Sequence, residues 1–200
     1  TVSQVVAITL TGTNDAPTIT SADLAGSVDE LLEANEAAGA TLSGSGTIAF
    51  ADVDLSDSHN VGVVANSATG ETYYGTLVAE VSEVAGADAG SVTWTYTVTD
   101  DDINFLGATD GLTQTYTVTV DDLNGGTVSQ VVAITLTGTN DAPTITSADL
   151  AGSVDELLEA NEAAGETLSD SGTIAFADVD LSDSHNVGVV ANSATGETYY

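Results

Sequence analysis

Residues 115–136 read TYTVTVDDLNGGTVSQVVAITL and contain two strand-like runs joined by a turn. In residues 115–120 every second residue is apolar and the others are threonine, and a similar alternation follows over residues 128–136. A period of two residues is typical of a strand that buries one face. The intervening residues 121–126 are rich in Asp, Asn and Gly, which favour a tight turn, and Asn and Gly tolerate positive φ. This stretch therefore predicts an antiparallel β-hairpin.

The rest of the repeat unit shows further strand-like segments. The clearest is 92–99, where Trp94 and Tyr96 alternate with threonines and are expected in the core. Other strands are expected near four segments, namely 18–28, 46–51, 60–66 and 72–84. Seven strands separated by turns predict an all-β fold, an antiparallel immunoglobulin-like β-sandwich. A capping-box pattern after Ser27 also predicts a short helix at about 28–37.

The composition excludes several classes of function. The chain has 31 acidic residues, no Lys and no Arg, and a formal net charge of −31. Without basic side chains it is not expected to bind nucleic acid or an anionic membrane surface. It has no run of 18 apolar residues to span a bilayer, and no Cys for a disulfide or a thiolate metal site. Hydrophobic residues make up 42% and charged residues only 16%, which favours a folded chain over a disordered one.

The sequence contains a long internal repeat. Residues 1–74 and 127–200 are identical except for Ala40/Glu166 and Gly44/Asp170, so the period is 127 − 1 = 126 residues. That length suits a whole domain. The prolines Pro17 and Pro143 mark the expected linkers. We expect residues 1–13 to be the last strand of a preceding repeat, 14–140 a complete repeat and 141–200 the first half of the next, as in a segment of a longer tandem array.

Many acidic residues concentrate in three loops of the predicted sandwich. The loop after 46–51 and the hairpin at 121–126 are expected at the end where the chain enters, and Asp100-Asp101-Asp102 at the end where it leaves. Each junction between repeats would then collect acids from both domains and from the linker. Converging carboxylates favour a hard dication, and Ca²⁺, which takes six to eight oxygen ligands, fits better than Mg²⁺. The pattern starting at Asp52 lacks the Gly and Glu of an EF-hand, so a different kind of site is expected.

The candidate metal ligands are the acids of these loops, the Asn-Asp pair of each linker, and their copies in the second repeat. They are Asn14, Asp15, Asp52, Asp54, Asp57, Asp100, Asp101, Asp102, Asp121, Asp122, Asn140, Asp141, Asp178, Asp180 and Asp183.

The remaining polar residues are interpreted as structural. The other acids considered are expected to be solvated loop residues: Glu33, Glu36, Glu71, Glu80, Glu83, Asp88 and Asp110. His59, with its copy His185, is expected to be an exposed loop residue, since Ca²⁺ prefers oxygen. The adjacent Asp57, Ser58 and His59 do not form a catalytic arrangement, and no enzyme is expected. The threonine ladders are read as a solvent-facing sheet surface.

Four motifs together resemble a known family. They are TGTNDAP at 137–143, FADVDLSDSH at 50–59, VTWTYTVTDDD at 92–102 and TYTVTVDDLNGGT at 115–127. This set is similar to the VCBS repeat of giant bacterial RTX-type adhesins, whose domains are also cadherin-like. Asp52-Val53-Asp54 resembles the cadherin Asp-x-Asp motif. The resemblance implies a calcium-stiffened extender module that is exported by type I secretion and displayed at the bacterial cell surface.

Two functions are therefore weighed. The first is a calcium-rigidified spacer in a fibrous adhesin that supports adhesion and biofilm formation, whose partners are neighbouring repeats of the same chain. The second is a module that itself binds glycan or associates with other copies into an extracellular filament. A binding module is expected to expose loop aromatics, and Tyr73, Tyr74 and Phe105 are the candidates. Uniform negative charge is expected to oppose side-by-side contact unless Ca²⁺ bridges it.

Overall fold

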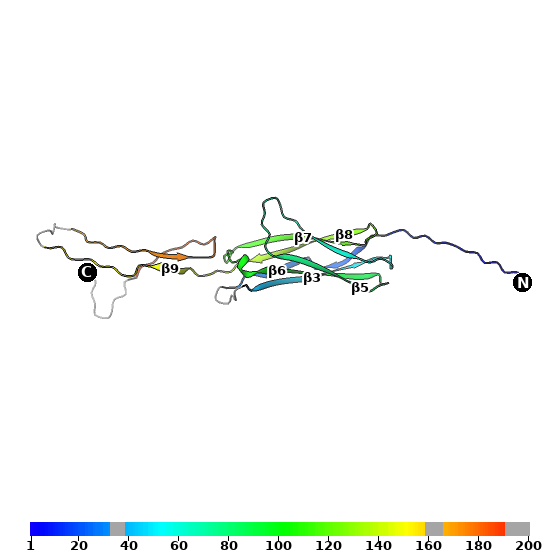
Figure 1. The fold of residues 1–200 in the computed structure, drawn as a ribbon, viewed down its shortest axis with the longest axis horizontal. Coiled ribbons are helices and arrows are strands. Elements are labelled where there is room, and N and C mark those ends of the chain that lie inside the picture. Colours follow the sequence, from blue (N-terminus) through cyan, green and yellow to red (C-terminus); the bar gives the residue numbers. More distant parts are fainter. Residues whose placement is uncertain (33–38, 159–165, 191–200) are drawn as a thin grey trace.

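The protein is described by a computed structural model that covers residues 1–32, 39–158 and 166–190. Residues 18–137 form a sandwich of two four-stranded sheets, and residues 144–177 contribute a separate two-stranded sheet. Figure 1 shows the sandwich in the middle of an elongated chain, with the N-terminal residues extending from one end and the second sheet beyond the other. No helix in these described ranges is long and apolar enough to cross a membrane.

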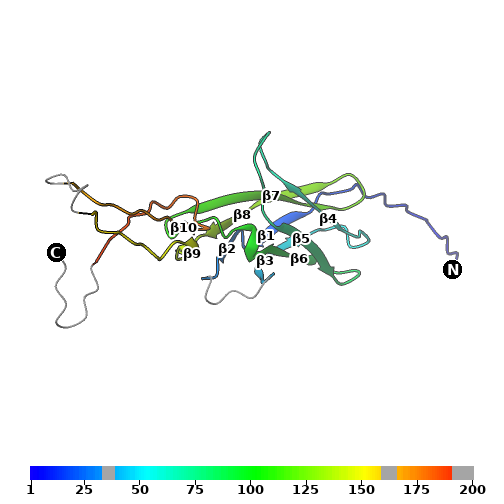
Figure 2. The same ribbon diagram turned by 60° about the vertical axis from the view of Figure 1, so that its left-hand side comes forward.

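The two sheets of the sandwich have different strand orders. The first sheet runs β1 (Thr18–Ala22), β3 (Thr41–Ala51), β6 (Ala89–Thr99), β5 (Thr76–Glu83). The second runs β2 (Ala25–Asp29), β8 (Thr127–Thr137), β7 (Gly111–Asp121), β4 (Asn60–Ala65). This is the strand distribution of an immunoglobulin-like sandwich, and the predicted all-β fold class is confirmed. Figure 2 shows both layers from a second direction.

The sandwich has eight strands where seven were expected, because the segment predicted as one strand at 18–28 is divided. Its first half, β1, pairs antiparallel with β3, and its second half, β2, pairs parallel with β8. Between them the Asp23 carbonyl accepts a hydrogen bond from Trp94 Nε1 at 2.8 Å, and the Leu24 carbonyl accepts one from Ala133 N at 2.8 Å. These bonds hold the two residues at which the chain crosses from the first sheet to the second. The sandwich is therefore not purely antiparallel.

The predicted helix at about 28–37 is wrong over its first residues. Strand β2 continues to Asp29, and Glu30, Leu31 and Leu32 are not helical. Residues 33–38, which include Glu33 and Glu36, lie outside the described residues. Glu30, the acid that the capping-box pattern assigned to the first turn of a helix, instead directly follows a strand, because parallel pairing with β8 fixes the preceding residues in the sheet.

The core is formed by the inner faces that the period-two pattern predicted. Trp94 and Tyr96 are fully buried, and Tyr116 is 4% exposed. Gly46 on β3 leaves room for the indole, because a Cβ there would overlap the Trp94 ring. Gly46 also interrupts the apolar alternation, and for this reason the sequence suggested a strand that begins near residue 46. The observed strand β3 begins earlier, at Thr41.

The hairpin between β7 and β8 has the expected position but a different turn conformation. Positive φ falls on Leu123 (62°) and Gly125 (111°), not on Asn124. The side chain of Asp121 accepts the backbone N–H of Leu123 at 2.8 Å. The side chain of Asp122 accepts the N–H groups of Asn124 and Gly126, each at 2.8 Å. These Asx-type bonds hold the turn and direct Asp122 inward.

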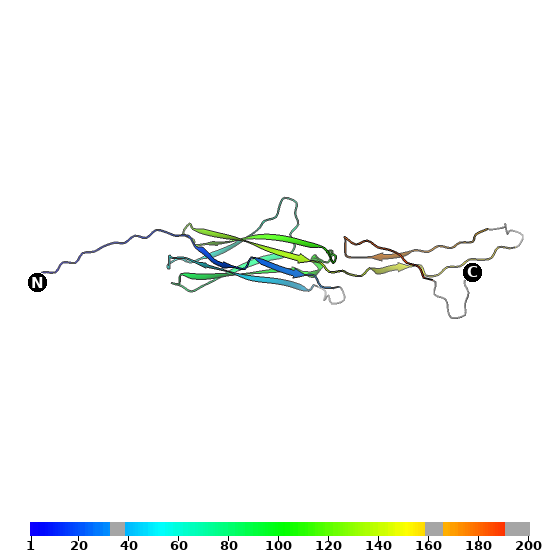
Figure 3. The same cartoon turned by 180° about the vertical axis from the view of Figure 1, so that it is seen from behind.

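The sequence repeat is also a structural repeat. Strand β9 (Thr144–Ala148) pairs with β10 (Ile174–Ala177) in the register of β1 with β3, displaced by 126 residues, and the same irregularity recurs in both pairs. Thus Thr18 faces Ala51, and Thr144 faces Ala177. Seen from behind in Figure 3, β9 and β10 continue the long axis of the sandwich.

Candidate metal centres

The sandwich concentrates carboxylates at the end where residues 14–17 approach it, which we call the proximal end. The loop after β3 and the β7–β8 turn both lie there. Asn14 Nδ2 donates to Asp122 Oδ2 at 2.9 Å, and Asp15 N donates to Asp54 Oδ2 at 2.7 Å. The linker segment is therefore tied to both acidic loops, as the loop arrangement predicted.

Three carboxylates form what we call the proximal cluster: Asp52, Asp57 and Asp122. One oxygen from each lies within 4.8 Å of the others. Asp52 is 4% exposed and Asp122 is fully buried. Asp57 Oδ2 is buried without a hydrogen-bond partner. The pKa of Asp122 is lowered by its hydrogen bond from Asn14 and by backbone N–H groups of the turn, against the opposing effect of burial, so this carboxylate remains ionised.

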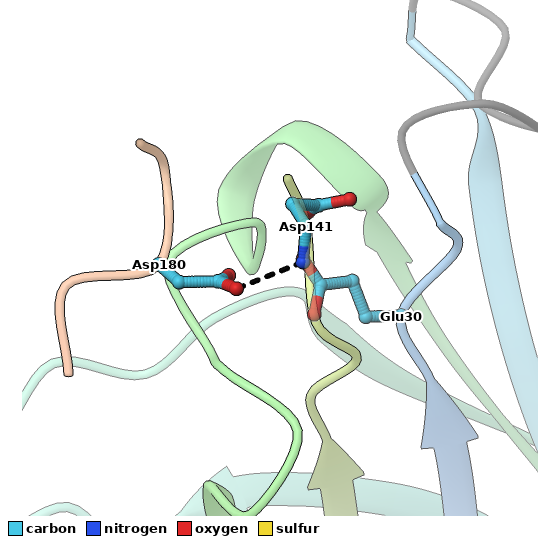
Figure 4. A group of neighbouring side chains, drawn as sticks. All are labelled: Glu30, Asp141 and Asp180. Carbon is cyan, nitrogen blue, oxygen red and sulfur yellow. Dashed lines mark hydrogen bonds between the residues drawn. The ribbon is translucent and has the colours of Figure 1, made fainter. Parts of the chain in front are cut away.

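A second group, the junction cluster, lies at the other end and consists of Glu30, Asp141 and Asp180. Figure 4 shows them converging from the end of β2, from the linker after β8, and from the loop that follows β10. Each is 3% exposed, and one oxygen from each lies within 4.8 Å of the others. Asp141 N donates to Asp180 Oδ2 at 2.8 Å.

Several oxygens at the junction are left without partners. Thr139 N donates to Glu30 Oε2 at 2.8 Å, but Glu30 Oε1 and Asp180 Oδ1 are buried and unpaired. Asp100, fully buried beside the cluster, accepts Leu31 N through Oδ1 at 2.9 Å, and its Oδ2 is also unpaired. Buried, unpaired carboxylate oxygens are costly unless a proton or a cation satisfies them.

Burial of these acids changes their ionisation. Desolvation, together with the charges of Asp141, Asp180 and Asp100, raises the pKa of Glu30 from 4.5 to about 7, while the Thr139 hydrogen bond opposes the shift. Desolvation also raises the pKa of Asp180, with repulsion from neighbouring carboxylates. The chain contains no Lys or Arg to compensate these charges. The donor set is all oxygen and partly unpaired, so the residues present fit a hard dication such as Ca²⁺.

The metal-free chain should therefore lose stability as the pH rises. Because the folded-state pKa of Glu30 is about 7 and its ordinary value is 4.5, the folded state binds this proton more tightly than the unfolded state. The contribution is complete below about pH 4.5 and disappears as the pH passes about 7. We expect the melting temperature in EDTA, followed by circular dichroism, to fall over this window. In Glu30→Gln the fall should be smaller, and an identical fall would contradict this role for Glu30.

Some predicted ligands do not join either cluster. Asp101 and Asp102 are exposed, and Asp102 Oδ2 accepts the Thr99 hydroxyl at 2.6 Å. Asp121 caps its turn, and Asp183 is exposed. Three others bond to a cluster residue without being part of a cluster, namely Asn14, Asp54 and Asn140, and Asp15 bonds to Asp54. Asp178 bonds His185 at 2.8 Å.

The sequence-based interpretation missed Glu30, His59 and Glu83. Glu30 could have been found only from the parallel β2–β8 pairing, which carries it to the end where the linker begins. His59 was expected to be exposed, but its side chain is 6% exposed and lies between two carboxylates. Glu83 accepts both His59 N and the His59 ring, so it is not merely a solvated acid. By contrast, Glu71 and Asp110 do accept local backbone N–H groups in loops.

Together these features define an immunoglobulin-like β-sandwich with clusters of buried acids at both ends, which could hold metal ions. No protein-family model matches the chain, and no curated protein matches it. Among solved structures, it is similar to the cadherin-like domains 1 to 4 of zebrafish RET, with 12% identity and a TM-score of 0.35. The match covers 67% of this chain and 28% of the length of that one.

Proposed function

We propose that this chain is a calcium-stiffened structural repeat in the stalk of a long extracellular or cell-surface fibrous adhesin. The observation that carries the proposal is the junction cluster. It combines Glu30 from the sandwich, Asp141 from the linker and Asp180 from the loop that follows β10, all three buried in a chain that has no Lys or Arg. An ion held by these oxygens ties successive repeats together and fixes the angle between them.

Calcium is favoured over magnesium by the number and type of oxygens available. Asp100 adds a further unpaired buried oxygen beside the three carboxylates. Mg²⁺ requires a small octahedral shell and usually retains water, whereas Ca²⁺ accepts irregular sets of carboxylates and carbonyls. The proximal cluster offers a second site of the same chemistry within one sandwich. Each junction in an array would then combine one site inside a repeat with one between repeats.

The wider setting rests on the motif resemblance. The similarity to VCBS repeats of RTX-type adhesins supports a bacterial surface location, type I secretion, and a role in adhesion and biofilm formation. A purely mechanical role, without catalysis, also accounts for near-identical copies within one chain, because a stalk needs length more than it needs a distinct pocket. Residues 14–140 serve as the complete unit, and the flanking segments belong to its neighbours.

Small-angle scattering on a chain of several repeats tests this function. In millimolar Ca²⁺ we expect an extended rod whose maximum dimension grows in proportion to the number of repeats. EDTA should shorten the maximum dimension and broaden the distance distribution, since the junction carboxylates then repel one another. An identical curve in both conditions would contradict calcium stiffening.

Lateral association into a filament is the second candidate, and the distribution of charge favours it. The acids of β1–β8 are Asp29, Glu80, Glu83 and Asp121, and all but Glu80 end their strands. The sheet surfaces are thus largely uncharged, and most of the acids lie in the loops. Glycan binding is less favoured, because Tyr73, Tyr74 and Phe105 pack against the core.

Sedimentation velocity in Ca²⁺ separates the stalk function from the filament function. A stalk unit remains monomeric, and a filament unit associates.

A further inference from the structure

His59 makes an unusual set of contacts for a residue in a loop. Its Nε2 lies 3.2 Å from Asp52 Oδ2 and its Nδ1 lies 2.7 Å from Glu83 Oε2. The backbone N–H of the same residue donates to Glu83 Oε1 at 3.0 Å. The imidazole also packs on Phe50, a core residue, with ring centroids 4.7 Å apart. The side chain is thus fixed on three sides, by two carboxylates and the edge of the core.

The contact partner Asp52 belongs to the proximal cluster. Its two oxygens have separate partners: Oδ1 accepts Asp54 N at 2.9 Å, and Oδ2 faces the imidazole. Rotation of the Asp52 carboxylate would break one of these bonds. His59 therefore determines which way this carboxylate presents its oxygens to Asp57 and Asp122.

The same arrangement occurs in the second repeat. His185 Nε2 lies 2.8 Å from Asp178 Oδ2, and its ring packs on Phe176 with centroids 4.9 Å apart. No hydrogen bond to a second carboxylate is present for His185 among the described contacts, and its side chain is more exposed, at 29%. The His–Asp contact and the packing of the ring on phenylalanine thus recur in both repeats, and Glu83 adds a second carboxylate contact to His59.

We infer that His59 is a positioning residue for the metal site of the proximal cluster, and that it acts by orienting Asp52. This inference rests on the proposed calcium function. A ligand carboxylate held by an outer hydrogen-bond partner loses less freedom when it binds an ion, and removing such a partner typically weakens metal affinity about 10- to 100-fold. Glu83 fixes the imidazole in turn. The chain Glu83–His59–Asp52 thus connects strand β5 to the calcium site.

Calorimetric titration of the 200-residue chain with CaCl₂ tests the inference. The Asp122→Asn variant identifies which part of the isotherm belongs to the proximal cluster. His59→Leu should weaken that affinity about tenfold, and His59→Gln, which keeps one N–H donor, should weaken it less. His185→Leu is the matched control. It removes the same kind of contact in the second repeat and should leave the proximal affinity unchanged.

The metal-free melting temperature separates positioning from packing. A residue that only fills space would lower this temperature and leave the calcium affinity unchanged, and that result for His59→Leu would overturn the inference. An equal loss of proximal affinity in His185→Leu would overturn it as well. If the wild-type chain binds no calcium, the proposed function itself fails. If it binds calcium and His59→Leu binds equally well, only the positioning role fails.

Discussion

Removal of calcium with EDTA should lower the melting temperature of the 200-residue chain by roughly 10 °C or more relative to millimolar Ca²⁺. An ion that binds only the folded state stabilises it by about 2.7 kcal/mol per site when its concentration is a hundredfold above Kd. For a domain of this size, each kcal/mol moves the melting temperature by roughly 4 °C. We expect the full stabilisation by the ion because the chain has no Lys or Arg that could replace it beside the clustered carboxylates.

Two variants make this expectation specific. Asp122→Asn removes a fully buried carboxylate from the proximal cluster and should reduce the difference between Ca²⁺ and EDTA. Asp101→Asn makes the same chemical change at an exposed acid outside both clusters and should leave the difference intact. Equal melting temperatures in Ca²⁺ and EDTA for the wild-type chain would show that the ion does not stabilise the folded chain.

The local features of the fold could be predicted because they depend on alternation along one strand. The patterns at 92–99 and 115–120 assign Trp94, Tyr96 and Tyr116 to the core, where the structure places them. The division of the first strand could not be predicted in this way. It depends on hydrogen bonds from Trp94 and Ala133, which are distant in the sequence.

The acidic loops show the same contrast between local and distant information. Loop order alone was enough to bring Asp52, Asp57 and Asp122 together. It could not distinguish among the three consecutive acids at 100–102, which form a 3₁₀ turn. Three residues per turn direct adjacent side chains about 120° apart. Asp100 is therefore buried beside the junction, and Asp101 and Asp102 face solvent.

The linker also proved more constrained than its composition suggested. Glycine is conformationally permissive, so the composition of the linker alone suggests that Gly138 leaves the interdomain angle free. In the structure it is buried, and a Cβ at this position would overlap the carbonyl oxygens of Leu106 and Gly107. The glycine is needed for close packing of the linker against this loop. Packing therefore holds the linker up to Gly138, and beyond it the chain is held by the hydrogen bonds from Asp141 N to Asp180 and from Leu181 N to the Phe105 carbonyl.

Asp180 is the residue through which the second repeat contributes to the junction cluster. Its Oδ2 accepts Asp141 N at 2.8 Å, and its Oδ1 is buried and unpaired. Asp54 is its counterpart in the first repeat and accepts Asp15 N at 2.7 Å through the same oxygen. The two aspartates therefore have the same local role, and Asp180 also meets Glu30, a carboxylate from the other side of the junction.

Asp180→Asn should consequently loosen the junction while leaving the sandwich folded. The amide keeps the size and one oxygen but removes a charge on which calcium affinity depends. In millimolar Ca²⁺, small-angle scattering of the 200-residue chain should show a shorter maximum dimension for Asp180→Asn, with an unchanged circular dichroism spectrum. Asp54→Asn should leave that dimension unchanged, because Asp54 contacts the segment that precedes the sandwich and not the junction with the second repeat. If Asp180→Asn also scatters like the wild type, direct contacts set the angle, among them the packing of Gly138 and the hydrogen bond from Leu181 N to the Phe105 carbonyl, and the ion contributes stability but not stiffness.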